Sequence, residues 1–147
     1  MEGKETSLSN PLAFIDGLFQ GALEQNEGKL QGDEYGEHEA YEALLQSSEF
    51  VEKIPYLNKA SLGRIPHNAL VRYRGLVQDV YNEEYFTGVY EQKTVKKGGG
   101  ELISSKLVLS KYRDIIDEAQ SVAANGADVT VSDFESPNCK IMQRQSL

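Results

Sequence analysis

The sequence predicts an α+β fold in which two helices precede an antiparallel β segment. Three observations favour this class. Apolar residues recur at helical spacing between residues 10 and 50, a stretch of two-residue alternation begins after Pro66, and aromatic and β-branched residues dominate the stretch that follows. With 147 residues, the chain is long enough to bury the core of one domain.

The first helix is predicted to begin at Asn10-Pro11, because asparagine caps helix N-termini and proline is accepted in the first turn. Its apolar residues share one face: Ile15, Leu18, Phe19 and Ala22. Gly17 and Gly21 each weaken a helix by about 1 kcal/mol relative to alanine. This helix is therefore expected to need a surface to pack against. A loop is expected to follow over residues 24–36.

A second helix is predicted at Glu37–Phe50. Its narrow inner stripe consists of Tyr41, Leu44, Leu45 and Ser48. It is expected to end before Ile54-Pro55, because a residue that precedes proline avoids the helical region. Residues 10–60 are therefore expected to be an acidic helical segment, preceded by a flexible N-terminus at residues 1–9.

Ala69–Val80 is predicted to be a strand, because its residues alternate between two faces. One face carries Val71, Tyr73, Gly75 and Val77, and the other carries Arg72, Arg74, Leu76 and Gln78. We expect Val71, Tyr73 and Val77 to be buried. Tyr85–Tyr90 is predicted to be a second strand that pairs with the first in an antiparallel hairpin.

A third strand is predicted at Leu102–Leu109, after a glycine-rich hairpin connection at Lys96–Gly100. A short helix is expected at residues 115–124 and an exposed loop at residues 125–140. Three strands suit a β-meander or the start of an OB-like barrel, but they are few for a stable β core. Residues 61–147 are therefore expected to be an antiparallel β segment with long loops. This segment is expected to form one structural unit with the helices, as the N-terminal part of a longer protein that is incomplete at its C-terminus.

The net charge of the chain is −8, and its distribution is uneven. Residues 1–60 carry 4 basic and 12 acidic side chains, whereas residues 61–147 carry 11 of each. This balance argues against strong autonomous DNA binding, which needs clustered basic residues. An acidic face either keeps a domain soluble or suits a basic protein partner. The N-terminus lacks the pattern of a signal peptide, and no apolar run is long enough to cross a membrane.

No motif predicts an enzyme, a cofactor or a metal site. Lys97–Gly100 places its lysine before the glycines, which reverses the order of a P-loop. Cys139 and His67 could form a nucleophile and base, but nothing nearby in the sequence activates the thiol. Glu83 and Glu84 are adjacent, so in a strand their side chains point to opposite faces. One cysteine and two histidines are too few for a typical His/Cys zinc site.

Arginine and aromatic residues cluster around the predicted hairpin, and this cluster is the strongest candidate for a binding site. It consists of Arg72, Tyr73, Arg74, Tyr81, Tyr85, Phe86 and Tyr90. Three interpretations remain open. The aromatic residues form the core while the arginines pair with local acids; the cluster contacts a protein, since these residue types are enriched at interfaces; or it stacks nucleic-acid bases.

The stretch Pro66–Val80 resembles the N-terminal signature of the mini-chromosome maintenance complex-binding protein family, which reads approximately Pro-Asn-Ser-Leu-Val-Arg-Phe-Arg-x-Met-Ile-Gln-Asp-Met. Glu84–Glu91 matches the family's following Glu-Phe-Tyr-x-Gly-Val-Tyr-Glu stretch. Shorter matches occur in the same order at Asn10–Leu12, Ile54–Asn58, Lys111–Asp114 and Arg144–Leu147. Two departures are His67, in place of a proline, and the triple glycine after Lys97.

The resemblance implies a non-catalytic protein that binds subunits of the mini-chromosome maintenance replicative helicase. It implies a role in the handling of that complex, its assembly or unloading, during DNA replication and sister-chromatid cohesion. It also implies a nuclear location, with a cytoplasmic fraction allowed. No membrane, small-molecule substrate, cofactor or metal is expected, and nucleic acid is expected to bind weakly or not directly. An OB-type single-strand nucleic-acid-binding module is the alternative function. The candidate partner-binding residues are Arg72, Arg74, Tyr85, Phe86 and Tyr90.

Overall fold

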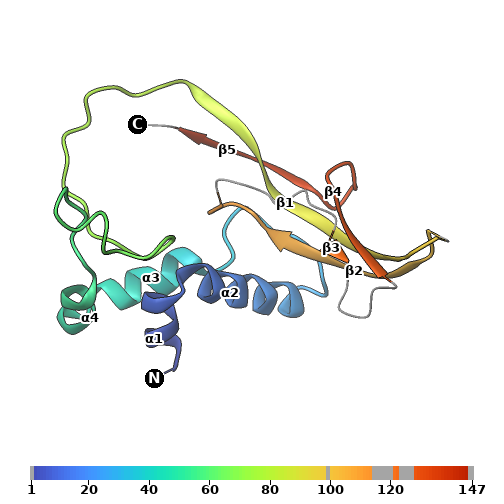
Figure 1. Cartoon of the computed structure of the whole chain (residues 1–147), viewed down its shortest axis with the longest axis horizontal. Helices are drawn as coiled ribbons and strands as arrows, with labels where there is room; N and C mark the ends of the chain where they lie inside the picture. The colour runs from blue at the N-terminus through green and yellow to red at the C-terminus, as the bar shows by residue number, and fades with distance from the viewer. Residues whose placement is uncertain (1, 99, 114–120, 123–127, 146–147) are drawn as a thin grey trace. The chain divides into compact units, whose positions relative to one another are not determined.

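The computed structural model describes residues 2–98, 100–113, 121–122 and 128–145. The chain divides into two compact units, Met1–Leu76 and Val77–Leu147. The first unit contains the helices and the second contains an antiparallel sheet (Figure 1). The predicted α+β class is confirmed. The expected division into a helical segment that ends at residue 60 and a β segment that begins at residue 61, within one structural unit, stays a prediction.

The first unit contains four short helices. They are α1 (Glu2–Ser9), α2 (Pro11–Gln25), α3 (Glu37–Leu45) and α4 (Ser48–Lys53). Asn10 caps α2 as predicted, because its side-chain oxygen accepts a hydrogen bond from the Ala13 amide at 3.2 Å. Residues 2–9, expected to be a flexible N-terminus, form α1. The predicted helix from residue 37 to residue 50 is two helices, which are separated at Gln46 and Ser47.

The core of the first unit lies on the predicted face of α2. Ile15 and Phe19 are buried there, and Phe19 packs edge-on against Tyr35 at 4.9 Å between ring centroids. Phe50 of α4 and Ile54 are also buried. The two glycines that weaken α2 are therefore offset by packing of its apolar face, which is how most short helices are stabilised.

The second unit is an open antiparallel sheet arranged around one long strand. Its strands are β1 (Glu83–Lys96), β2 (Leu102–Leu109), β3 (Ser121–Val122), β4 (Asp128–Asp133) and β5 (Lys140–Gln145). The order is β2-β1-β4-β3, and β5 also pairs with β1 (Figure 1). Among the described strands the sheet does not close, so the expected start of an OB-like barrel is an open sheet.

Strand β2 pairs with one edge of β1. Strands β4 and β5 share the other edge and lie end to end along it. Strand β4 pairs with residues 91–96 of β1, whereas β5 pairs with residues 83–89. Val89 is shared by β2 and β5, which therefore lie on opposite edges. The chain between β4 and β5, residues 134–139, loops out where it passes Tyr90 of β1.

The predicted strand at Ala69–Val80 is wrong, and so is its hairpin with Tyr85–Tyr90. The strand predicted at Tyr85–Tyr90 itself is confirmed, within β1. Residues 69–80 contain no strand; their one bridge pairs Arg72 with Tyr56 in parallel. The expected burial is also wrong, since Tyr73 and Val77 are 74% and 58% exposed and Val71 is half-buried. Strand β1 pairs instead with later segments of the chain: with β2 through residues 89–95, with β4 through residues 91–96 and with β5 through residues 83–89.

Later in the chain, one prediction is confirmed and others need correction. The strand at Leu102–Leu109 is confirmed as β2, and a hairpin connection joins it to β1. The loop expected at residues 125–140 instead contains β4 and the start of β5. The strand preference of the β-branched residues Val129, Thr130 and Val131 outweighs the turn preference of the residues next to them. Within the expected helix at residues 115–124, Ser121–Val122 is strand β3, and the remainder lies outside the described residues.

Candidate protein-interaction surface

Arg72 is held by contacts within the first unit. Its amide donates to the Pro55 carbonyl at 2.8 Å, and its carbonyl accepts from the Leu57 amide at 2.7 Å. Its side-chain Nε donates to the Ile54 carbonyl at 2.8 Å, and the guanidinium lies 4.0 Å from the centroid of the Tyr56 ring. Arg72 therefore closes the loop between Leu57 and Val71 and stabilises it.

The residues after Arg72 form an exposed apolar segment, which we call the connecting segment, Tyr73–Val80. Every residue of this segment is exposed, and the chain runs through it without a turn or bend. Leu76 is 87% exposed and Val80 is 55% exposed. Arg74 also lies here, with its side chain exposed. Exposed apolar side chains in succession are typical of a surface that another molecule covers.

The three aromatic candidates on β1 have different environments. Tyr85 is 73% exposed. Phe86 is half-buried, and the Arg144 guanidinium of β5 lies 4.9 Å from its ring centroid. Tyr90 is 7% exposed and packs against the Phe134 ring at 5.3 Å. Tyr85 can contact a partner, whereas Tyr90 offers almost no surface and serves the core. The two arginine candidates belong to the first unit, and these aromatic residues belong to the second.

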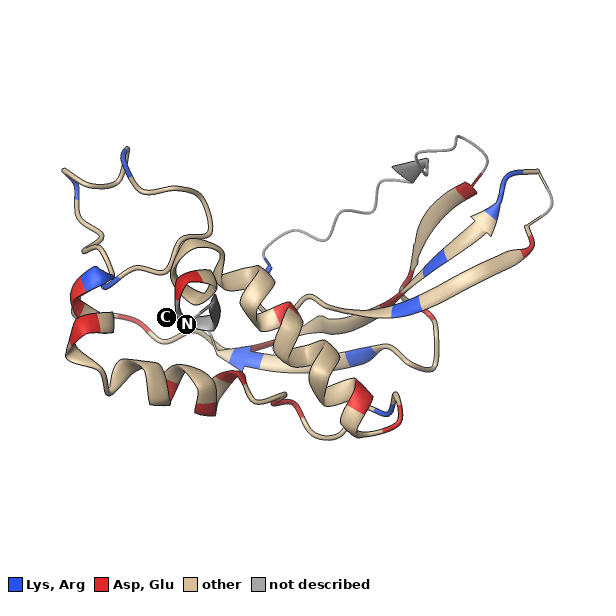
Figure 2. Cartoon of the chain, turned by 90° about the horizontal axis from the view of Figure 1, so that it is seen from below, with Lys and Arg blue, Asp and Glu red and all other residues tan. Residues whose placement is uncertain are grey.

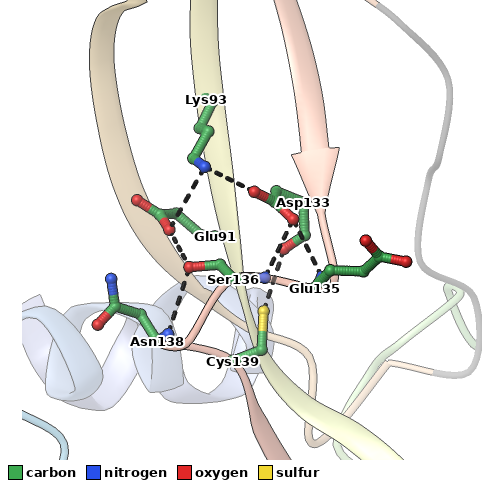
Figure 3. A network of polar contacts seen from close by, with 7 residues as sticks. All are labelled: Glu91, Lys93, Asp133, Glu135, Ser136, Asn138 and Cys139. Atoms are coloured by element: carbon green, nitrogen blue, oxygen red, sulfur yellow. Dashed lines mark hydrogen bonds and ion pairs between the residues drawn. The ribbon is translucent and has the colours of Figure 1, made fainter.

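A polar network that the sequence analysis missed joins β1 to the loop at residues 134–139 (Figure 3). The Lys93 ammonium lies 2.6 Å from the Asp133 carboxylate and 4.0 Å from that of Glu91. Ser136 donates its hydroxyl hydrogen bond to the buried Glu91 carboxylate. This hydrogen bond is the main cause that lowers the pKa of Glu91. The Lys93 ammonium is the main cause that lowers the pKa of Asp133.

Further hydrogen bonds fix the loop itself. The Asp133 carboxylate accepts from the Glu135 amide at 3.0 Å and from the Ser136 amide at 3.1 Å. The Cys139 thiol donates to the Asp133 carbonyl at 3.0 Å (Figure 3). These contacts have a structural role, because they fix the loop that connects β4 to β5. The sequence signal was available in Glu91 and Lys93, whose opposite charges lie two residues apart and so share a face of a strand.

The excess of acidic side chains lies mainly on the helices, as the charge counts of residues 1–60 and 61–147 indicate. Figure 2 shows acidic residues at intervals along the helices, whereas the strands carry both signs. The charged residues of β4 are all acidic, those of β2 and β5 are all basic, and β1 has both. In the part of the chain that the structure describes, no group of three His, Cys, Asp or Glu side chains is arranged to hold a metal ion. Among the same residues, no helix is long and apolar enough to cross a membrane.

Comparison with known proteins identifies the family. The family model described as mini-chromosome maintenance replisome factor matches residues 41–147, which include Arg72, the connecting segment and the whole sheet. The chain belongs to the mini-chromosome maintenance replisome factor family. The resemblance found in the motifs at Pro66–Val80 and Glu84–Glu91 is thereby confirmed.

Relatives of this family match along most of the chain. A protein of Bos taurus named mini-chromosome maintenance complex-binding protein is 32% identical over 142 residues, which is 97% of this chain and 19% of that protein. One of the same name from Danio rerio is 27% identical over 139 residues, 95% of this chain and 19% of that protein. The chain thus spans about a fifth of the length of these curated relatives. No solved structure matches the chain.

Proposed function

We propose that this chain is a non-catalytic module that binds the mini-chromosome maintenance complex. Membership of the mini-chromosome maintenance replisome factor family carries the proposal, because the relatives are named for binding that complex. The exposed connecting segment lies within the matched residues and supplies an apolar surface for a protein partner. Tyr85 and Arg74, which are both exposed, are the remaining surface candidates from the sequence analysis.

We extend the proposal to the cellular role. Binding by this module helps the assembly or unloading of the replicative helicase, and through it DNA replication and sister-chromatid cohesion. The protein acts in the nucleus, with a cytoplasmic fraction. A fluorescent fusion of the full-length protein tests the location, and a uniformly cytoplasmic signal throughout the cell cycle contradicts it.

Direct binding tests the main proposal. The purified chain is immobilised and exposed to a reconstituted mini-chromosome maintenance complex, and saturable binding at physiological salt is expected. An unrelated protein of similar size and net charge is the negative control. The proposal fails if the complex and each of its separate subunits bind the chain no better than this control.

A nucleic-acid arm accompanies this assay. Single-stranded oligonucleotides are added at low and at physiological salt, since binding through phosphates weakens steeply with salt. The net charge of −8 leads us to expect little retention at either concentration. Tight binding to single strands together with no binding to the complex would favour the nucleic-acid module instead.

A further inference from the structure

We infer that the connecting segment, Tyr73–Val80, binds by strand addition: it pairs as a β-strand with an exposed sheet edge on a subunit of the mini-chromosome maintenance complex. This inference deepens the proposed function and rests on it. It names the part of the chain that makes the contact and the structural feature of the partner that receives it. Three observations carry the inference, and each concerns a different property of the segment.

The first observation is the unused hydrogen-bonding capacity of the backbone. Within the described chain, no backbone hydrogen bond is made by any residue from Tyr73 to Val80. The segment contains no proline, so each of its residues has both an amide donor and a carbonyl acceptor. Such a row of groups is what an added strand offers to a sheet edge.

The second observation is the backbone conformation. The chain passes from Tyr73 to Val80 without a turn or bend, and no residue of the segment has a positive φ, Gly75 included. A glycine with negative φ follows the same path as its neighbours. The backbone of the segment is therefore compatible with a β-strand along its whole length.

The third observation is the arrangement of side chains. A Cβ atom on Gly75 would lie 2.7 Å from the Cε1 atom of the Tyr73 ring. The ring therefore lies over the glycine two residues away, as expected when alternate residues share a face. The face that carries Tyr73 and Gly75 is consequently apolar at Gly75 too, although glycine has no side chain.

Charge defines the chemistry of the partner further. Arg74 lies near the start of the segment and Asp79 near its end. Cross-strand pairs of opposite charge stabilise a sheet, whereas like charges opposite one another destabilise it. The receiving edge is therefore expected to carry an acidic residue opposite Arg74 and a basic residue opposite Asp79. The chain's own β1 cannot take this place at residues 89–95, because both of its edges are already paired there.

Proline substitution at consecutive positions tests the inference. The variants are Gly75→Pro, Leu76→Pro, Val77→Pro and Gln78→Pro in the full chain, each compared with alanine at the same position. In an antiparallel ladder only alternate residues direct their N–H groups to a given neighbour. We therefore expect two prolines of one parity to weaken binding about fivefold to tenfold relative to their alanine partners. The two prolines of the other parity should change binding less than twofold.

Two further measurements interpret the result. Thermal unfolding of the free variants should match that of the parent chain, because these amides make no hydrogen bond to any residue that the structure describes. An equal loss of binding affinity for prolines at all four positions, or no loss at any position, overturns strand addition. Binding by the parent chain would still uphold the proposed function. Sedimentation of the free chain gives its oligomeric state. A dimer that the same two prolines dissociate would assign the segment to a second copy of this chain and overturn the partner proposed here.

Discussion

At the scale of single residues, Gly88 shows how a motif residue can be fixed by packing. It lies in β1 where the pairing with β5 shifts register between Thr87 and Val89. A Cβ atom built on it would lie 2.2 Å from the sulfur and 2.5 Å from the Cγ of Met142, which is 4% exposed. The Cγ atom is close to the backbone and cannot move far. Glycine is therefore needed here for close approach rather than for a special φ.

Gly88→Ala is expected to destabilise the chain by about 1–3 kcal/mol, because the added methyl group overpacks a buried contact. Urea denaturation measures the change in the free energy of unfolding. Gly63→Ala is the matched control, since its Cβ meets nothing within 4 Å and its φ is not positive. A loss of stability in the control equal to that of Gly88→Ala would refute the packing explanation.

The two arginines of the motif are expected to differ in their effect on stability. Arg72→Ala removes the hydrogen bond to the Ile54 carbonyl and the contact with the Tyr56 ring, at a cost of about 1–2 kcal/mol. Arg74→Ala alters an exposed side chain, and its effect is expected to stay within about 0.5 kcal/mol. Melting curves of both variants decide the matter, and a larger effect for Arg74→Ala would contradict the assignment of Arg72 to the fold.

At the scale of elements, local signals, including the hairpin connection between β1 and β2, were predictable from sequence, and the pairing of strands far apart in the chain was not. Helix α2 was predicted correctly because Asn10 and Pro11 act on their immediate neighbours. The strand at Ala69–Val80 was predicted wrongly because two-residue alternation describes an extended chain and does not specify which edge it pairs with. The sequence did not show that Tyr90 is buried whereas Tyr85 is exposed. The burial of Tyr90 depends on its contact with Phe134, which lies far along the sequence.

The loop between β4 and β5 is expected to make the sheet sensitive to acid. The pKa values of Glu91 and Asp133 are lowered in the folded chain. A lowered pKa means that the charged carboxylate stabilises the fold above its ordinary pKa, and that this stabilisation is lost as pH falls toward the folded value. The free energy of unfolding should therefore decrease as the pH falls below about 4.5 and further below 4.

Ser136→Ala tests this prediction, because the Ser136 hydroxyl is the main cause that lowers the pKa of Glu91. The variant should be less stable at pH 7, and its stability should change less between pH 5 and pH 3. Urea denaturation at several pH values measures both effects. Ser104→Ala, at an exposed position of β2, is the control. A Ser136→Ala variant with the pH profile of the parent chain would show that the hydrogen bond from Ser136 to Glu91 contributes nothing to acid sensitivity.

At the scale of the whole molecule, the connecting segment is the covalent link between two units that each have their own core. The first core contains Phe19 and Ile54, and the second contains Val89 and Leu109. An exposed segment with no backbone hydrogen bonds opens locally at little free-energy cost, and such segments are preferred sites of proteolysis. Limited proteolysis therefore tests whether the chain divides at this segment.

Trypsin is expected to cut first after Arg74, because this residue is exposed and its backbone makes no hydrogen bond within the described residues. Cleavage after Arg72 should be slower, since both its amide and its carbonyl are bonded to neighbouring residues. Mass spectrometry of the earliest fragments identifies the site, and Arg74→Gln should slow the first cut. Early fragments that begin at Tyr73 would contradict the structural distinction between the two arginines.

The central position of β1 has a consequence for synthesis of the protein on the ribosome. Strand β1 emerges before all of its partners, and the residues that pair with Glu83–Thr87 are not translated until Ile141–Gln145. A nascent chain that pauses before that point holds the first half of its longest strand without its β5 partner. Unpaired strand edges readily associate with other chains. The interval between translation of β1 and β5 is therefore the stage at which the growing chain most needs protection by a chaperone.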